Sequence, residues 1–204
     1  WANTTSGEMF ACTDATAGAN VWINVGSGSG DVWEMQGTLH GYLAGGSGGA
    51  PDWIDVATIQ KFNFANTSSE SNIGNLSAIN NTPTGHQNRT NGYVAGGHPT
   101  HNRIEKFNFS GSFSSSDHGD LSIAKHNHVG YSAQTDGYTS GGMAPSATNV
   151  IDKFSFASNT TASDHGDLFQ AILQPSGVSS ATHGYTIGGH PTSDTIQKFL
   201  FSSN

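Results

Sequence analysis

The chain repeats one short phrase four times, and this repetition limits its fold more than any other feature. Gly-Tyr-x-x-Gly-Gly begins at Gly41, Gly92, Gly137 and Gly184. Each copy is followed by Ile-x-Lys-Phe-x-Phe, and three of the four continue to a Gly-Asn/Asp-Leu step. Such self-similarity is typical of one supersecondary unit that is built several times and stacked on its own copies. We therefore expect four similar units.

The distances within the repeat are constant except at one place. From the repeated Lys to the next Gly step there are 13 positions in every unit, and from that Gly to the next repeated Tyr there are 19. The distance from Tyr to Lys instead takes the values 19, 13, 15 and 13. A constant distance indicates a segment held by packing, whereas a variable one indicates a surface loop. All the length variation therefore falls in one equivalent loop.

Each unit reads as short strands joined by turns. In Ile-x-Lys-Phe-x-Phe, Ile and Lys fall on one face and the two Phe on the other, which is the period of a strand. Asn91-Gly92 and Asp136-Gly137 are turn dipeptides. Apolar residues make up only 34% of the chain and charged residues 11%, so that Ser, Thr, Asn and Gly fill a composition poor in helix formers. We predict an all-β protein whose units, of about 45 residues and four strands, have the size of a propeller blade.

The repeat resembles a known family. Gly-Gly after a hydrophobic strand, in units of this length, is similar to the kelch repeat, although Phe stands where kelch has the Trp of its third strand. "GYTSGGMAPSATNVIDKFSFASNTTASDHGDL" resembles kelch-like repeats in virion proteins of marine bacteriophages, and "SGEMFACTDATAGANVWINVG" resembles a segment common in phage structural proteins. The resemblance implies a β-propeller in a tail fibre, another tail appendage or a capsid decoration.

The N-terminal part offers a strand that the fourth unit lacks. That unit stops after its Phe strand, without the Gly-Asp-Leu step. Counting 19 positions back from Tyr42 reaches Ile23, and Asn24 and Val25 follow, which matches the polar-then-aliphatic pair of the step. We predict that Val21–Val25 completes the last blade and closes a four-bladed ring, which would hide the strand edges. The alternative is an open array that a neighbouring subunit completes.

This interpretation divides the chain into an N-terminal extension or anchor, residues 1–19, and a propeller, residues 20–204. Within the extension, Met9 to Cys12 are expected to pair beside Val21–Val25 or to reach a partner.

The composition argues against several classes of protein. A formal charge of −8 disfavours nucleic-acid binding, and no apolar run is long enough for membrane insertion. Cys12 is the only cysteine, so an internal disulfide is excluded. His118 and His165 stand where the first unit has Ile73, so the repeat itself does not require imidazole. With no catalytic motif in view, we predict a protein that is not an enzyme and that has no cofactor and no metal site.

The variable loops are the predicted binding surface. They cover residues 47–58, 98–103, 143–150 and 190–195, and equivalent units would place them on one face. Mixed aromatic and polar side chains there suit a partner protein or a sugar. The alternative is that these loops are solvent-exposed and free to vary. The candidate residues are Trp53, which we expect to be the strongest single contact, and Asp52, Asp55, His98, His101, Arg103, His190 and Asp194.

The repeated lysines are interpreted as structural. If the Phe strand and the Gly-Asp-Leu strand form a hairpin, Lys106 is expected opposite Asp120 and Lys153 opposite Asp167. The stem of each Lys would then pack between blades while its ammonium meets a carboxylate. The set of structural repeat positions is Lys61, Lys106, Lys153 and Lys198 together with Asn75, Asp120 and Asp167.

Together these features predict a non-enzymatic structural and binding protein of a virion, extracellular in setting. Its expected partners are other virion proteins, copies of itself and a host-surface glycan. Two alternatives are a secreted lectin-like glycan-binding protein and a subunit of an extracellular filament.

Overall fold

The structure, a computed structural model, describes residues 9–18, 21–26, 40–48, 52, 54–65, 71–111 and 114–202. Every regular element among them is a β-strand, which confirms the predicted all-β class. None of these residues belongs to a helix that could cross a membrane. The strands are β1 (Met9–Asp14), β2 (Val21–Gly26), β3 (His40–Ala44), β4 (Thr58–Asn63), β5 (Ser71–Asn75), β6 (Thr84–Gln87), β7 (Asn91–Ala95), β8 (Arg103–Asn108), β9 (Ser116–Asp120), β10 (Val129–Ser132), β11 (Asp136–Ser140), β12 (Val150–Ser155), β13 (Ser163–Asp167), β14 (Ser176–Ser179), β15 (His183–Ile187) and β16 (Ile196–Leu200).

The chain divides into two compact units, Trp1–Glu34 and Met35–Asn204. The first contains the antiparallel pair β1–β2, in which Phe10 lies opposite Asn24 and Cys12 opposite Trp22. This confirms that the segment Met9 to Cys12 pairs beside the strand that begins at Val21.

The predicted closure of a ring by this strand is not what the structure shows. β2 is hydrogen-bonded to β1, and the last sheet consists of β14, β15 and β16 in the described part of the chain.

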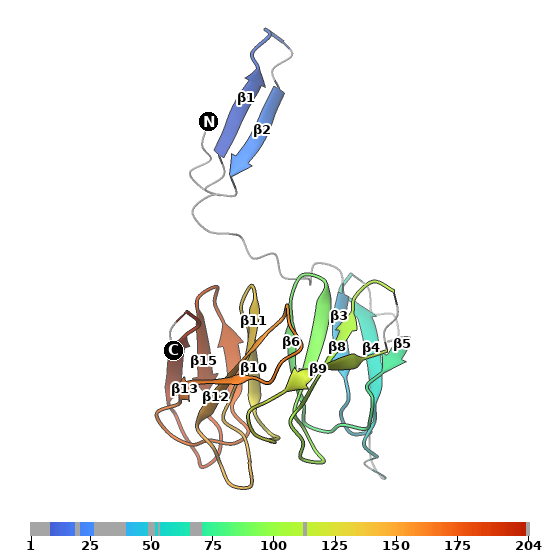
Figure 1. Ribbon diagram of the computed structural model, residues 1–204, viewed down its shortest axis with the longest axis vertical. Helices are drawn as coiled ribbons and strands as arrows, with labels where there is room; N and C mark the ends of the chain where they lie inside the picture. The colour runs from blue at the N-terminus through green and yellow to red at the C-terminus, as the bar shows by residue number, and fades with distance from the viewer. Residues whose placement is uncertain are drawn as a thin grey trace. The chain divides into compact units, whose positions relative to one another are not determined.

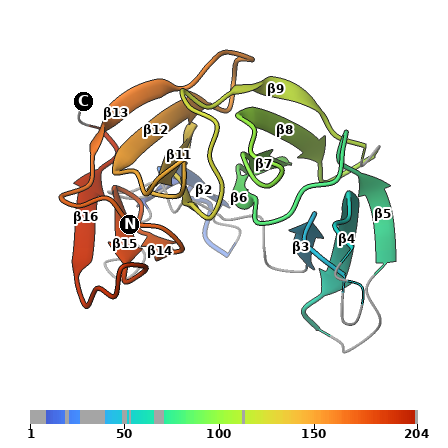
Figure 2. The ribbon, with the colours of Figure 1, turned by 90° about the horizontal axis from the view of Figure 1, so that it is seen from below.

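The second unit contains four antiparallel sheets, one for each copy of the repeat (Figure 1). Their strand orders are β3-β4-β5, β6-β7-β8-β9, β10-β11-β12-β13 and β14-β15-β16. Gly-Tyr-x-x-Gly-Gly supplies β3, β7, β11 and β15, and Ile-x-Lys-Phe-x-Phe supplies β4, β8, β12 and β16. Within this unit the sheets follow one another along an arc, with β3–β5 and β14–β16 at its two ends (Figure 2). The predicted four-stranded unit is thus present in full in the two central sheets.

Consecutive sheets are joined by the same aromatic contact. The repeated Tyr of one sheet stacks on the second Phe of the next sheet, with ring centroids 4.5 Å apart for Tyr93 and Phe156 and 4.7 Å apart for Tyr138 and Phe201. The Tyr138 hydroxyl also donates a hydrogen bond to the Phe201 carbonyl, at 2.6 Å. Tyr42 stacks in the same way on Phe109 of the second sheet, at 4.6 Å. The two repeated phrases are therefore the two halves of one interface.

The Gly-Gly pair, which follows β11 within its own sheet, binds the linker that leads to the next sheet. Gly141 and Gly142 have φ values of 65° and 99°, a region that side chains disfavour. The linker to the last sheet passes close to both glycines. The Gly142 amide donates a hydrogen bond to the Ile172 carbonyl oxygen at 2.8 Å. A Cβ atom on Gly141 would lie only 2.7 Å from the same oxygen. Equivalent bonds run from Gly97 to Lys125 and from Gly46 to Asn80. The glycines thus anchor each linker in turn.

We expect Tyr138→Ala to lower the free energy of unfolding by about 3–5 kcal/mol, because it removes a buried ring between two sheets. Tyr185→Ala is the matched control, since Tyr185 has the same place in the last sheet but is only partly buried. Urea unfolding of both variants in dilute solution measures the difference. Equal losses at the two positions would contradict the proposed role of the stack.

Candidate functional site

The variable loops lie along one edge of the second unit. The linker that joins two sheets lies between the variable loops of those sheets. In the linker from the second to the third sheet, the Lys125 carbonyl accepts a hydrogen bond from the Gly97 amide, at the start of one loop. The next linker residue, His126, forms a backbone bridge with Met143 in the following loop. The following linker repeats this arrangement, with Leu173 bridging His190. Since loops and linkers alternate in this way, the prediction that the loops share one face is confirmed for the described loops.

One polar cluster on this edge joins a loop to a linker. The Thr100 hydroxyl and the His126 Nδ1 are 3.0 Å apart, and the rings of His98 and His126 are in edge contact at 5.6 Å. We had predicted His98 but not His126. The sequence signal for His126 was its place in "HNH", within a segment of constant length that gave no indication that it reaches the loops.

The other predicted residues of the first two loops lie apart from this cluster. Asp52 is exposed, and Asp55 pairs through its backbone with Ser47. Arg103 lies near Glu105, with Nε 3.9 Å from Oε2. Burial lowers the pKa of His101, and the charge of Arg103 lowers it further.

The last loop presents His190 and Asp194, both exposed, and Trp53 lies outside the described residues. Among the residues that are described, no three His, Cys, Asp or Glu side chains come together in a way that could hold a metal ion. The loop edge thus brings together His98, Thr100 and His126, and His101 lies within the electrostatic reach of Arg103.

The predicted pairing of the repeated Lys with Asp is wrong. In the β8–β9 hairpin Lys106 lies opposite Ser116, and in β12–β13 Lys153 lies opposite Ser163. Asp120 lies opposite Arg103 and Asp167 opposite Val150, and a bulge after the repeated Ile shifts the register by one residue between these pairs and the Lys–Ser pairs.

The repeated Lys instead lies beside the repeated Tyr on the neighbouring strand. Lys153 Nζ is 5.8 Å from the centre of the Tyr138 ring and 3.9 Å from Asp136 Oδ2. Lys61 has the same place over Tyr42, at 6.0 Å. Asn75, the remaining structural candidate, pairs with Thr58. The lysines therefore cover the edge of the aromatic interface.

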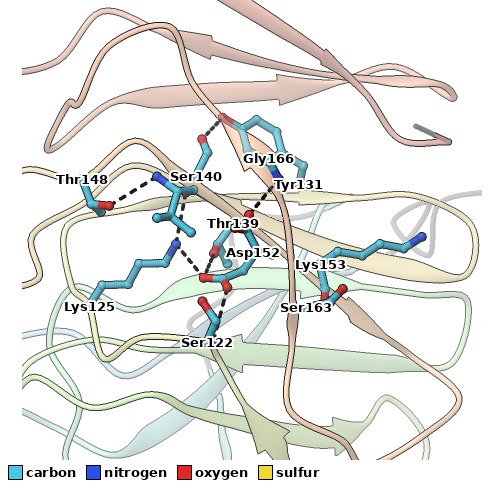
Figure 3. A network of polar contacts seen from close by, with 12 residues as sticks. Ser122, Lys125, Tyr131, Thr139, Ser140, Thr148, Asp152, Lys153, Ser163 and Gly166 are labelled. Carbon is cyan, nitrogen blue, oxygen red and sulfur yellow. Dashed lines mark hydrogen bonds and ion pairs between the residues drawn. The ribbon is translucent and has the colours of Figure 1, made fainter. Parts of the chain in front are cut away.

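A buried ion pair lies inside the second unit, between the second and third sheets. Lys125 and Asp152 have fully buried side chains and form an ion pair at 2.9 Å. The Asp152 carboxylate also accepts from the Ser122 amide at 3.2 Å and from the Thr139 hydroxyl at 3.5 Å. Figure 3 shows the Lys125 ammonium pointing at this carboxylate, while Lys153 points away from it. Burial lowers the pKa of Lys125 against the opposing effect of Asp152.

The repeat explains this pair as a structural contact. Lys125 occupies the linker position that holds Asn80 and Ile172 in the neighbouring units, and all three are buried. Asp152 occupies the position of Glu105 and Gln197, which also accept a linker amide, from Ser77 at 2.8 Å and Gln170 at 3.2 Å. Ile172 and Gln197 stand at the same two buried positions without an ion pair, so the pair of Lys125 and Asp152 is one version of a linker anchor. Its complete burial also denies access to a substrate.

Further buried polar groups continue from this pair toward the last sheet. The Tyr131 hydroxyl contacts the Ser140 hydroxyl at 2.8 Å and also bonds to Thr186 of the last sheet. His86 Nδ1 donates to the Tyr131 carbonyl at 3.0 Å. No pattern in the sequence indicates that these polar side chains meet, because Ser, Thr and His are common in the chain and their positions vary between repeats.

Neither the family models nor the curated proteins to which the chain was compared give a match.

We expect Lys125→Ile alone to destabilise the protein by about 3–5 kcal/mol, because it leaves the Asp152 carboxylate buried without its partner. The double variant Lys125→Ile/Asp152→Gln installs the pair that the next repeat uses and should recover most of this loss. Urea unfolding of the single and double variants tests the coupling. A double variant as unstable as the single one would show that the pair is not an interchangeable linker anchor.

The stability of the protein should depend on the protonation of His86. Burial lowers the pKa of His86 to about 4 from its ordinary value of 6.5, so the unfolded chain binds this proton more tightly than the folded one. Neutral His86 therefore contributes its full share to the free energy of unfolding above about pH 6.5. This stabilisation, about 3 kcal/mol, is lost as the pH drops toward 4. His86→Gln keeps a donor for the Tyr131 carbonyl and should flatten this part of the pH profile of unfolding. A pH profile of unfolding that is equally steep in His86→Gln would contradict the assignment.

Proposed function

We propose that this chain is a non-enzymatic structural and binding protein of a virion, in which the four sheets of Met35–Asn204 are blades of a kelch-like β-propeller and the loop edge is presented outward. The observation that carries the proposal is the separation of polar groups in the second unit. Inside it, polar side chains such as Asp152 and Tyr131 bind neighbouring sheets. At the loop edge, His98, His190 and Asp194 are exposed.

The loop edge supports a binding role because it can change without disturbing the fold. Loop length varies between the repeats only there, while the linkers that lie between the loops keep the same backbone bonds. This combination of a rigid scaffold and variable loops is typical of binding surfaces. The ring and hydroxyl groups of His98, Thr100 and His126 offer donors and acceptors to a host-surface glycan or to another virion protein.

The same cluster is poorly suited to catalysis. Thr100 and His126 have the spacing of a nucleophile and its base, but such a base needs a group that stabilises its positive charge. Burial lowers the pKa of His126, and the neighbouring His98 lowers it further. This arrangement disfavours the imidazolium that a general base must form, and it supports a binding role over an enzymatic one.

A secreted glycan-binding protein is the second candidate, because the exposed groups of the loop edge would serve it equally well. The two differ in where the protein is found. Antibodies against the loop peptide of residues 96–102 should label intact virus particles in immunogold electron microscopy, because the proposed protein is a particle component with this edge outward. Antibodies against an unrelated buried strand, such as β11, are the control and should label only disrupted particles. Protein found in the medium and on no particle would overturn the virion role and favour the secreted one.

A further inference from the structure

The two ends of the array of sheets expose the two halves of the interface that joins its interior. We call the face of a sheet that meets the next sheet its forward face, which carries the repeated Tyr and Ile. The opposite face, which carries the two repeated Phe, is its rear face. Between consecutive sheets of the array, a forward face always meets a rear face, as Tyr138 meets Phe201.

The forward face of the last sheet is apolar and exposed. Val178 is 56% exposed, whereas Tyr131, in the same place one sheet earlier, is 1% exposed and packs against the next sheet. Ile196 is 66% exposed, whereas Ile151 is buried. Part of this difference has another cause. Strand β12, which carries Ile151, is flanked by the outer strand β13, whereas β16, which carries Ile196, has no outer strand in the described chain. Val178 lies on the opposite, inner strand β14, so its exposure reflects the missing next sheet.

The rear face of the first sheet is exposed in the complementary way. Phe64 is 54% exposed, whereas its equivalents Phe156 and Phe201 are 7% and 6% exposed beneath the Tyr of the preceding sheet. Leu43 is 49% exposed, whereas Val94 in the same place on β7 is buried against the first sheet. Among the described residues, both ends therefore expose apolar side chains at places that are buried between the interior sheets, whereas terminal repeats of a soluble array carry polar ones there.

The geometry points to a second copy of this chain as the occupant of these faces: we propose that the forward face of sheet β14–β16 binds the rear face of sheet β3–β5 of another copy, head to tail. Tyr185 would stack on Phe64 as Tyr138 stacks on Phe201, and Val178 would be covered as Tyr131 is. No other partner is so well specified, because the chain already contains this interface three times. The contact is heterologous, so copies joined in this way form a ring if the rotation closes and a filament if it does not.

A second copy fits the faces better than the same chain does. Within the second unit, sheets β3–β5 and β14–β16 lie at opposite ends of the arc (Figure 2). The inference concerns how copies join through the ends of the array, whereas the virion role rests on the loop edge. Either can fail without the other.

Two variants that each block one end test the contact. Phe64→Glu places a charge on the rear face and Val178→Glu on the forward face, and burial of an unpaired charge should weaken association by about a hundredfold or more. Phe169→Glu is the control, because Phe169 is 93% exposed and its equivalents Ser77 and Ser122 are exposed in sheets that have a neighbour. Since all three positions are exposed, urea unfolding of dilute protein should show unchanged stability.

Sedimentation velocity at increasing protein concentration is the measurement. The unmodified chain and Phe169→Glu should form larger species, Phe64→Glu and Val178→Glu should each remain monomeric, and an equal mixture of these two should form dimers and nothing larger. A mixture that stays monomeric would overturn the proposal, and so would either variant associating on its own. An unmodified chain that is monomeric at every concentration would also overturn it, and a loss of stability in both variants would then assign the contact to closure within one chain.

Discussion

The stack of each repeated Tyr on the second Phe of the next sheet is the contact on which the rest of the structure depends. A single sheet of three or four short strands is only marginally stable, and here each one is covered by a neighbouring sheet on at least one face. The Tyr hydroxyl adds direction, because it reaches the backbone carbonyl of the same Phe, as Tyr93 does at Phe156 and Tyr138 at Phe201. One phrase thus supplies the ring and the other supplies the surface that receives it, which is why the two recur together.

The way in which the chain crosses between sheets keeps the binding surface separate from this core. The Gly-Gly pairs fix each linker, and the linkers hold the bases of the variable loops. Positions inside the linker are tolerant as long as the space is filled, so that Asn80, Lys125 and Ile172 all occur at one buried place. The loops beyond the anchor have no such restriction. Length can therefore change in the loops, and polarity can change in the linkers, without loss of the fold.

Much of this fold could be predicted from the residues alone. Period-two alternation and constant spacing identified the strands, and the single variable distance identified the loop edge, because packing leaves both marks directly in the sequence. The opposition of Lys106 and Asp120 failed because the distance between the two phrases does not fix where the hairpin turns, and Asp120 lies opposite Arg103. A matching distance likewise did not fix the partner of Val21–Val25, which among the described residues pairs with β1, and the structure shows no closed ring. The ion pair of Lys125 and Asp152 left no pattern to find, since it occurs at only one of the sheet boundaries.

The central claim is that linkers and stacked tyrosines unite the four sheets of the second unit into one body. Amide hydrogen exchange of the intact chain tests it most directly, through Gly97 and Gly142, whose amides bond to linker carbonyls and belong to no strand. If the sheets form one body, these two amides should be protected to the same degree as the central strands β7 and β11. If they exchange as fast as the exposed loops while the strands stay protected, the sheets open independently and the claim is wrong.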